Sequence, residues 1–91
     1  MGLMAGNAIV LKVASPTVVC GEYIRRCLDA AGLPSGLFHH LVINGWEITK
    51  VLLANQVDKI FFTGSVQNGI QLMRDAAETL TPLSLELGGK V

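Results

Sequence analysis

The chain has 91 residues, of which 51% are apolar and only 15% are charged. This length allows one small domain at most, and an ordinary soluble domain carries about 25% charged residues. Seven basic and seven acidic side chains give a formal net charge of zero, which argues against binding to nucleic acid or to an anionic membrane surface. The shortage of charge leaves two explanations open: a module covered by a partner or a second copy, or a piece of a longer protein.

Membrane insertion, secretion and metal binding are not expected either. Charged residues interrupt every apolar run before the roughly 18 residues of a spanning helix, and residues 1–7 show no basic start of a signal peptide. Cys20 and Cys27 form neither a disulfide framework nor a metal-ligand spacing. The adjacent His39 and His40 would point to opposite faces of a strand and would not share one ion. We therefore expect no metal site and a reducing, cytoplasmic location.

The first third of the chain predicts a strand followed by a helix. Residues 8–11 form a continuous apolar run, which is typical of a strand buried on both faces. Ser15 and Pro16 predict a helix start, because a hydroxyl caps the first turn and proline is tolerated there. Gly32, with Pro34 beyond it, predicts the helix end.

This helix carries apolar residues at the spacing i, i+4, i+7 and i+8. They are Cys20, Ile24, Cys27, Leu28 and Ala31. Because this stripe would face the core, both cysteines are predicted to be buried structural thiols rather than nucleophiles.

The rest of the chain predicts two further strand–helix repeats and a final strand. The expected elements are a strand at 41–43, a helix at 46–54, a strand at 58–62, a helix from 65 to about 79 and a strand at 83–87. The apolar stripe of the last helix consists of Val66, Ile70, Met73 and Ala77. This alternation predicts an α/β fold, a partial Rossmann-like parallel sheet of about four strands and three helices.

The turn after the third strand is the first candidate binding site. The chain passes through Gly64 into a helix beginning at Ser65, which points unpaired backbone N–H groups and the positive end of the helix dipole at one place. A phosphate or pyrophosphate suits that place, and the missing side chain of Gly64 lets a ligand approach. The spacing is not the common G-x-G-x-x-G, and taken alone an ordinary turn with a serine cap is the simpler interpretation.

Two charged residues at predicted strand ends are the other candidates. Glu86 ends the fourth strand and Lys12 ends the first, where open α/β sheets bind their ligands. A carboxylate followed by two glycines suits a general base, and Lys12 suits a ribose hydroxyl or a phosphate. Taken alone, each is more simply a solvated charge at the end of a strand.

Taken together, these segments resemble the NAD(P)-dependent aldehyde dehydrogenase superfamily. The resemblance runs through residues 6–12, 30–36, 62–65 with Gly69, and 85–90, in that order. Its most specific part is Phe-Thr-Gly-Ser followed by Glu-Leu-Gly-Gly-Lys, and the third strand is similar to that of bacterial semialdehyde dehydrogenases. The resemblance implies that residues 1–91 are a partial NAD(P)-binding domain.

The resemblance also implies which residues hold the cofactor, NAD or NADP. Lys12 would bind the adenosine ribose hydroxyls, and the neutral Ser15 stands where many NAD-preferring members have Glu, so that NADP is admitted. Ser65 and the helix N-terminus would contact the pyrophosphate, Gly64 would keep the approach open, and Gly69 closes the family's G-x-x-x-x-G pattern.

At the other end of the cofactor, the resemblance implies that Glu86 is the general base that activates water for thioester hydrolysis. Leu87 and Gly88 would border the nicotinamide. Gln67 and Asn68 depart from the family pattern beside the adenine, where an aliphatic residue is usual at the position of Asn68.

The implied reaction is the oxidation of an aldehyde to a carboxylic acid by a full-length homo-oligomer. The family's nucleophilic cysteine lies downstream of the Glu86 strand, and its oxyanion-stabilising Asn lies upstream of this chain. We therefore expect the 91 residues alone to be inactive. Three alternatives stay open: a truncated chain that only folds or associates, part of a CoA-acylating aldehyde dehydrogenase, against which Glu86 argues, and a non-enzymatic interaction module.

Overall fold

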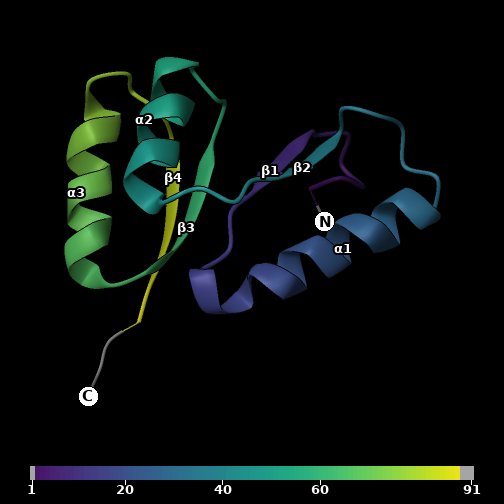
Figure 1. Ribbon diagram of the computed structural model, residues 1–91. Helices are drawn as coiled ribbons and strands as arrows, with labels where there is room; N and C mark the ends of the chain where they lie inside the picture. The colour runs from purple at the N-terminus through teal and green to yellow at the C-terminus, as the bar shows by residue number, and fades with distance from the viewer. Residues whose placement is uncertain (1, 89–91) are drawn as a thin grey trace. The chain divides into compact units, whose positions relative to one another are not determined.

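The computed structural model describes residues 2–88, which form two compact units, unit 1 (residues 2–44) and unit 2 (residues 45–88). Unit 1 contains β1 (Ile9–Leu11), a 3-10 turn (Ser15–Thr17), α1 (Val18–Ala30) and β2 (Phe38–His40). Unit 2 contains α2 (Gly45–Ala54), β3 (Ile60–Gly64), α3 (Val66–Ala77) and β4 (Leu83–Leu87) (Figure 1). No helix in this part of the chain is long and apolar enough to cross a membrane.

The predicted fold class is confirmed. The described residues contain four strands and three α-helices, and both strand pairings are parallel. The hydrogen bonds divide the strands into two pairs, β1 with β2 and β3 with β4. Each pair is joined by one helix, α1 or α3, as expected for parallel neighbours that need a crossover connection.

The predicted position of the second strand, residues 41–43, is wrong. β2 ends at His40, and its three residues pair with β1 from Ile9–Phe38 to Leu11–His40. The N–H of Leu41 donates to the Leu11 carbonyl at 2.9 Å and closes the ladder. Since β1 is only three residues long, the apolar residues that follow have no strand left to pair with.

The predicted start and end of the first helix are both close to the observed ones. The first turn is 3-10, and the hydroxyl of Thr17 at the N-cap donates to the Ala14 carbonyl instead of capping α1. At the other end Gly32 has φ +84°, and the N–H of Leu33 donates to the Leu28 carbonyl at 3.1 Å. This six-to-one bond is the Schellman arrangement that a glycine at this position permits.

The face that α1 buries differs from the predicted stripe. Cys20 and Cys27 are both exposed, so the prediction of buried thiols is wrong. The buried residue of α1 is Gly21, which lies against the imidazole of His40 on β2. The helix therefore turns its smallest residue, rather than its apolar stripe, toward the strands of its own unit.

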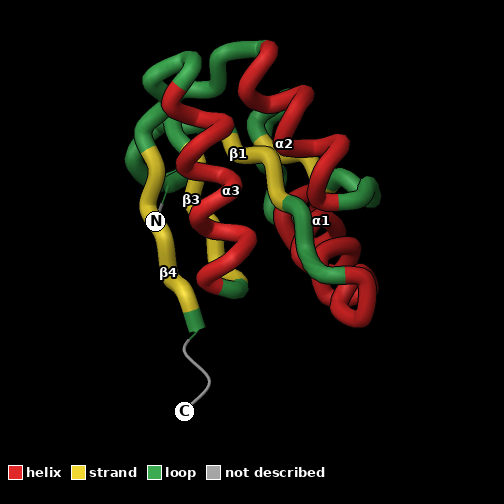
Figure 2. The backbone as a smooth tube through the Cα atoms, turned by 90° about the vertical axis from the view of Figure 1, so that its left-hand side faces the viewer, coloured by secondary structure: helices red, strands yellow, loops and turns green. Residues whose placement is uncertain are grey.

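Unit 2 has an apolar core beneath its two helices. The buried apolar side chains of the described residues are Ile48 and Leu53 on α2 and Leu72 and Ala76 on α3. Both helices lie on the same side of the β3–β4 pair (Figures 1 and 2). Gly69, also buried, brings the first half of α3 close to β4.

Apolar side chains on the outer face of α3 and on one face of β3 are exposed to solvent. The predicted stripe of α3, formed by Val66, Ile70, Met73 and Ala77, is exposed. Burial alternates along β3, and Phe61 is 77% exposed. The expectation of strands buried on both faces is therefore not met in unit 2, where only one face of β3 is covered.

Candidate functional site

The carboxyl ends of β3 and β4 lie together at one edge of unit 2. Thr63 pairs with Glu86 and Gly64 with Leu87, and the N–H of Gly88 donates to the Gly64 carbonyl at 3.1 Å. Figure 2 shows the turn from β3 into α3 beside the end of β4. The parallel register thus brings the glycine–serine turn and the predicted general base to the same strand end.

The start of α3 has the donors that an anion requires. Ser65 is extended at the N-cap, and its hydroxyl oxygen accepts the N–H of Asn68 at 3.1 Å. Its carbonyl accepts the N–H of Gly69 at 3.0 Å. The N–H groups of Val66 and Gln67 precede the first intrahelical bond, so no acceptor within the helix is available to them. A capping serine still has its hydroxyl proton to donate, and the helix dipole favours a negative charge here.

The glycines at this strand end have different surroundings. A Cβ on Gly69 would lie 2.6 Å from Cδ2 of Leu87, so this glycine lets α3 approach β4. A Cβ on Gly64 would lie 2.6 Å from Cζ of Phe62, so the space beside this glycine holds the chain's own ring. Gly88 has nothing within 4 Å of the corresponding position. Open space for a ligand is therefore found at Gly88, whereas Gly64 and Gly69 serve packing within the unit.

Glu86 lies on the uncovered face of the strand pair. It is exposed, while Leu85 and Leu87 on either side are half-buried. Thr63, its direct partner on β3, is also exposed. The carboxylate and the threonine hydroxyl therefore share one open face, and the side chain of Leu87 packs toward Gly69 on the other. The rest of the motif, Gly89 and Lys90, lies outside the described residues.

Lys12 and Ser15 belong to unit 1. Lys12 is exposed directly after β1, and the backbone of Ser15 opens the 3-10 turn before α1. The N–H and the hydroxyl of Thr17 donate to the Ala14 carbonyl at 2.8 and 2.9 Å. The structure thus brings six of the eight predicted site residues together in unit 2 and holds the other two in one short connection of unit 1.

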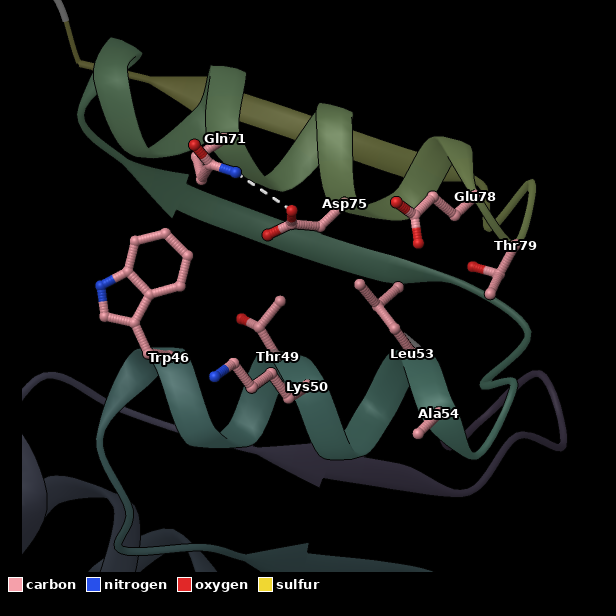
Figure 3. Close-up of a pocket in the computed structure, with 9 residues that line it drawn as sticks. All are labelled: Trp46, Thr49, Lys50, Leu53, Ala54, Gln71, Asp75, Glu78 and Thr79. Atoms are coloured by element: carbon pink, nitrogen blue, oxygen red, sulfur yellow. Dashed lines mark hydrogen bonds between the residues drawn. The ribbon is translucent and has the colours of Figure 1, made fainter.

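A separate pocket of about 420 Å³ lies between α2 and α3 (Figure 3). Its walls include Trp46, Lys50 and Leu53 from α2 and Gln71, Asp75 and Glu78 from α3. The Gln71 amide donates to Asp75 at 3.0 Å. The six predicted residues of unit 2 are not among its walls, and none of the sequence motifs predicts this pocket. The sequence signal that could have indicated this pocket is the spacing i, i+4, i+7 of the polar residues Gln71, Asp75 and Glu78, which places them on one face of a helix.

The fold and the strand end define an α/β protein in which a serine-capped helix start lies beside the end of a parallel strand. The sequence profile described as the aldehyde dehydrogenase family matches residues 1–91. The chain therefore belongs to the aldehyde dehydrogenase family, as the resemblance of its motifs implies.

Individual relatives agree with this assignment. The chain is 44% identical over 89 residues to an NADP-dependent glyceraldehyde-3-phosphate dehydrogenase of Scenedesmus vacuolatus, covering 97% of this chain and 37% of that protein. It superimposes on an NADP-dependent enzyme of E. coli with a TM-score of 0.90 at 38% identity, covering 96% of this chain and 18% of the other. It also superimposes on an NAD-dependent aldehyde dehydrogenase of Sinorhizobium meliloti with a TM-score of 0.84 at 36% identity, covering 91% of this chain and 17% of the other.

The match covers only part of each relative. The chain spans 18% to 37% of the length of the first two curated relatives. By their names the relatives include both NAD- and NADP-dependent enzymes.

Proposed function

We propose that this chain contributes the pyrophosphate site and the general base of an NAD(P)-dependent aldehyde dehydrogenase, which oxidises an aldehyde to a carboxylic acid. The observation that carries the proposal is the Ser65-capped start of α3 beside the end of β4, with Ser65 two residues beyond Thr63, the register partner of Glu86. The donors suit the phosphates of a dinucleotide, and a carboxylate at the same strand end suits a general base for the hydrolysis that releases the acid.

The residues at the turn fit a pyrophosphate. The hydroxyl proton of Ser65 and the N–H groups of Val66 and Gln67 are donors at the positive end of α3. None of these three residues is buried. Gly88 leaves open space on the neighbouring strand. These donors would hold the two phosphates, and the absence of a side chain at position 88 would admit the nicotinamide end.

Glu86 would act on water. When bound, the dinucleotide supplies a hydride acceptor for the aldehyde carbon. The carboxylate of Glu86 would take a proton from the water that releases the acid and would hold it on a carboxylate oxygen. Its exposed position on the uncovered strand face leaves room for that water, and the backbone pairing of β3 with β4 fixes where the side chain begins.

The family resemblance assigns the adenosine ribose, and a pocket of unit 2 suits the adenine. By family resemblance Lys12 and Ser15 contact the ribose, and the neutral Ser15 admits NADP as well as NAD. On α3, Asn68 precedes Gln71 by one turn, and Gln71 lines the α2–α3 pocket with the half-exposed indole of Trp46. An adenine ring matches an indole face, so we assign the adenine to this pocket.

The 91-residue chain alone is expected to bind the dinucleotide weakly and to oxidise no aldehyde. Both of its cysteines are exposed on α1, and among the described residues neither thiol is hydrogen-bonded to a base. A nucleophilic thiol needs such activation. In the full-length context we propose an aldehyde as substrate and a homo-oligomeric assembly.

Substitution of Ser65 tests the proposal. Ser65→Asp keeps an N-cap acceptor but adds a negative charge, whereas Ser65→Ala removes the cap. In titrations with NADP and NAD monitored by calorimetry, S65D is expected to lose binding while it keeps its melting temperature. S65A is expected to weaken binding about fivefold and to lose about 1 kcal/mol of stability.

Ser35→Ala, in the exposed turn before β2, is the matched control and should change neither quantity. Equal binding by wild type and S65D would contradict the proposal. A wild-type chain that self-associates and whose melting temperature is unaffected by NAD and NADP would instead support the association alternative.

A further inference from the structure

His40 is a buried residue that hydrogen bonding does not explain. Its side chain is 1% exposed, and neither ring nitrogen has a hydrogen-bond partner. The nearest carboxylate oxygen, Oε2 of Glu22, lies 3.6 Å from Nδ1, which is too far for a good hydrogen bond. Buried polar atoms nearly always have partners, so an imidazole without any needs another reason for its place.

The reason is the shape of Gly21, which faces the ring from α1. A Cβ on this glycine would meet Nε2 directly and would lie 2.7 and 2.8 Å from Cδ2 and Cε1. Glycine weakens a helix interior relative to alanine, and its backbone here is ordinary helix. Gly21 and His40 are therefore each unfavourable alone and complementary together, and we call them the Gly21–His40 pair.

A charged cluster on α1 fixes the side chain beside this pair. Nε of Arg25 donates to both oxygens of Glu22 at 3.0 and 3.1 Å, and Nη1 of Arg25 donates to Asp29 at 2.5 Å. These hydrogen bonds from Arg25 hold the pKa of Glu22 at about 2, below its ordinary 4.5. The carboxylate nearest the ring is thus ionised and held in one orientation.

The two residues of the pair flank the connection between β1 and α1, which contains two predicted site residues, Lys12 and Ser15. His40 pairs with Leu11, the residue directly before Lys12. Gly21 follows the turn that Ser15 opens, one helical turn into α1. The segment Lys12–Ser15 therefore links the two elements that the Gly21–His40 pair holds at one separation.

We propose that the Gly21–His40 pair positions the segment Lys12–Ser15 for the adenosine ribose, which makes His40 a positioning residue. This inference rests on the proposed function, because it assigns a purpose to the placement of the ribose-binding segment. Loss of the fit on either side of the pair shifts α1 relative to β2, and the segment between β1 and α1 shifts with them.

Reciprocal substitution tests the inference in the full 91-residue chain. Gly21→Ala drives a methyl group into the ring, and His40→Val removes the ring. The double variant G21A/H40V places the methyl where the ring was. Each single variant is expected to raise the NADP dissociation constant about tenfold, and the double variant to restore most of it, as coupling between contacting residues allows.

The matched controls are His39→Val, on the exposed side of the same strand, and Gly45→Ala, where a Cβ meets nothing within 4 Å. Both should bind NADP like the wild type. A second readout is the set of backbone amide resonances of residues 12–17, which should move in each single variant and return in the double variant.

The outcomes separate the two proposals. If the wild type binds NADP and both single variants bind it equally well, the positioning role is overturned and the proposed function stands. If the wild type binds no dinucleotide, the proposed function fails, and the amide resonances decide: reciprocal rescue supports the pair and unchanged resonances overturn it. If G21A does not fold, a folded double variant supports the pair and an unfolded one overturns it.

Discussion

The two units repeat one arrangement but enclose different side chains. In each, a helix joins two parallel strands, and a glycine on that helix lies against a side chain of the second strand. In unit 2 the pair is Gly69 with the apolar Leu87, whereas in unit 1 it is Gly21 with His40. The same backbone approach therefore stabilises an apolar interface in one unit and confines an imidazole without a hydrogen-bond partner in the other.

The two units also differ in how much apolar surface they bury around these glycines. Unit 2 buries four apolar side chains and has strands of five residues. Unit 1 has strands of three residues, and among its described residues no apolar side chain is fully buried. Apolar burial is the main favourable contribution to folding. Unit 1 consequently depends more on shape and on the charges of α1 than unit 2 does.

Leu72→Ala in unit 2 has the largest expected effect on this comparison. Leu72 is 6% exposed, and truncating a buried leucine costs about 2 to 5 kcal/mol. Amide hydrogen exchange should speed up in β3, α3 and β4, while the amides of β1 and β2 change less. Met73→Ala, at the exposed neighbour, is the control. Equal loss of protection in both units would show a single cooperative core and break the comparison.

Gly69→Ala has a smaller expected effect. The new methyl would force Leu87 to move, and overpacking costs about 1 to 3 kcal/mol. The gain in helix propensity offsets about 1 kcal/mol of this. Denaturant unfolding should show that G69A lowers the free energy of unfolding by about 1 kcal/mol. When G69A is combined with Leu87→Ala, the loss caused by the added methyl group should be smaller. If Leu87→Ala aggravates the loss, steric fit is not what selects glycine in unit 2.

Glu22→Gln has the smallest expected effect, and this effect disappears in acid. The folded-state pKa of Glu22, about 2, is below its ordinary value of 4.5, so its ionised form stabilises unit 1 fully above pH 4.5. That contribution is lost as the pH falls from 4.5 to 2, and the stability curves of wild type and E22Q should converge there.

Melting temperatures measured from pH 7 to pH 2 check this expectation, and Glu78→Gln on unit 2 is the control carboxylate. Added salt should reduce the difference at pH 7, because the ion pairs of Glu22 are partly exposed. A difference that stays constant down to pH 2 would contradict the role of this carboxylate in unit 1.

Local sequence determined the elements whose ends are marked by residues with fixed backbone preferences. β4 matches its predicted span of residues 83–87, which Pro82 precedes. The predicted helix at 46–54 is α2 with one more residue, and α1 ends just before Gly32, as expected. The strand-to-helix turn at Ser65 and its cap also follow from a few neighbouring residues. Backbone geometry and capping act over one helical turn, so they can be predicted without the rest of the fold.

Tertiary structure alone decided which face each element buries and how the strands pair. α1 and α3 each carry apolar residues on more than one side, and the buried lines run through Gly21 and Gly69 rather than through the predicted stripes. β2 consists of Phe38, His39 and His40, and not of the apolar residues 41–43, because these three residues are the ones that pair with β1. These choices depend on the shape of side chains far away in the sequence. The reason for a glycine within a helix is therefore clear only when the side chain that occupies its Cβ position is known.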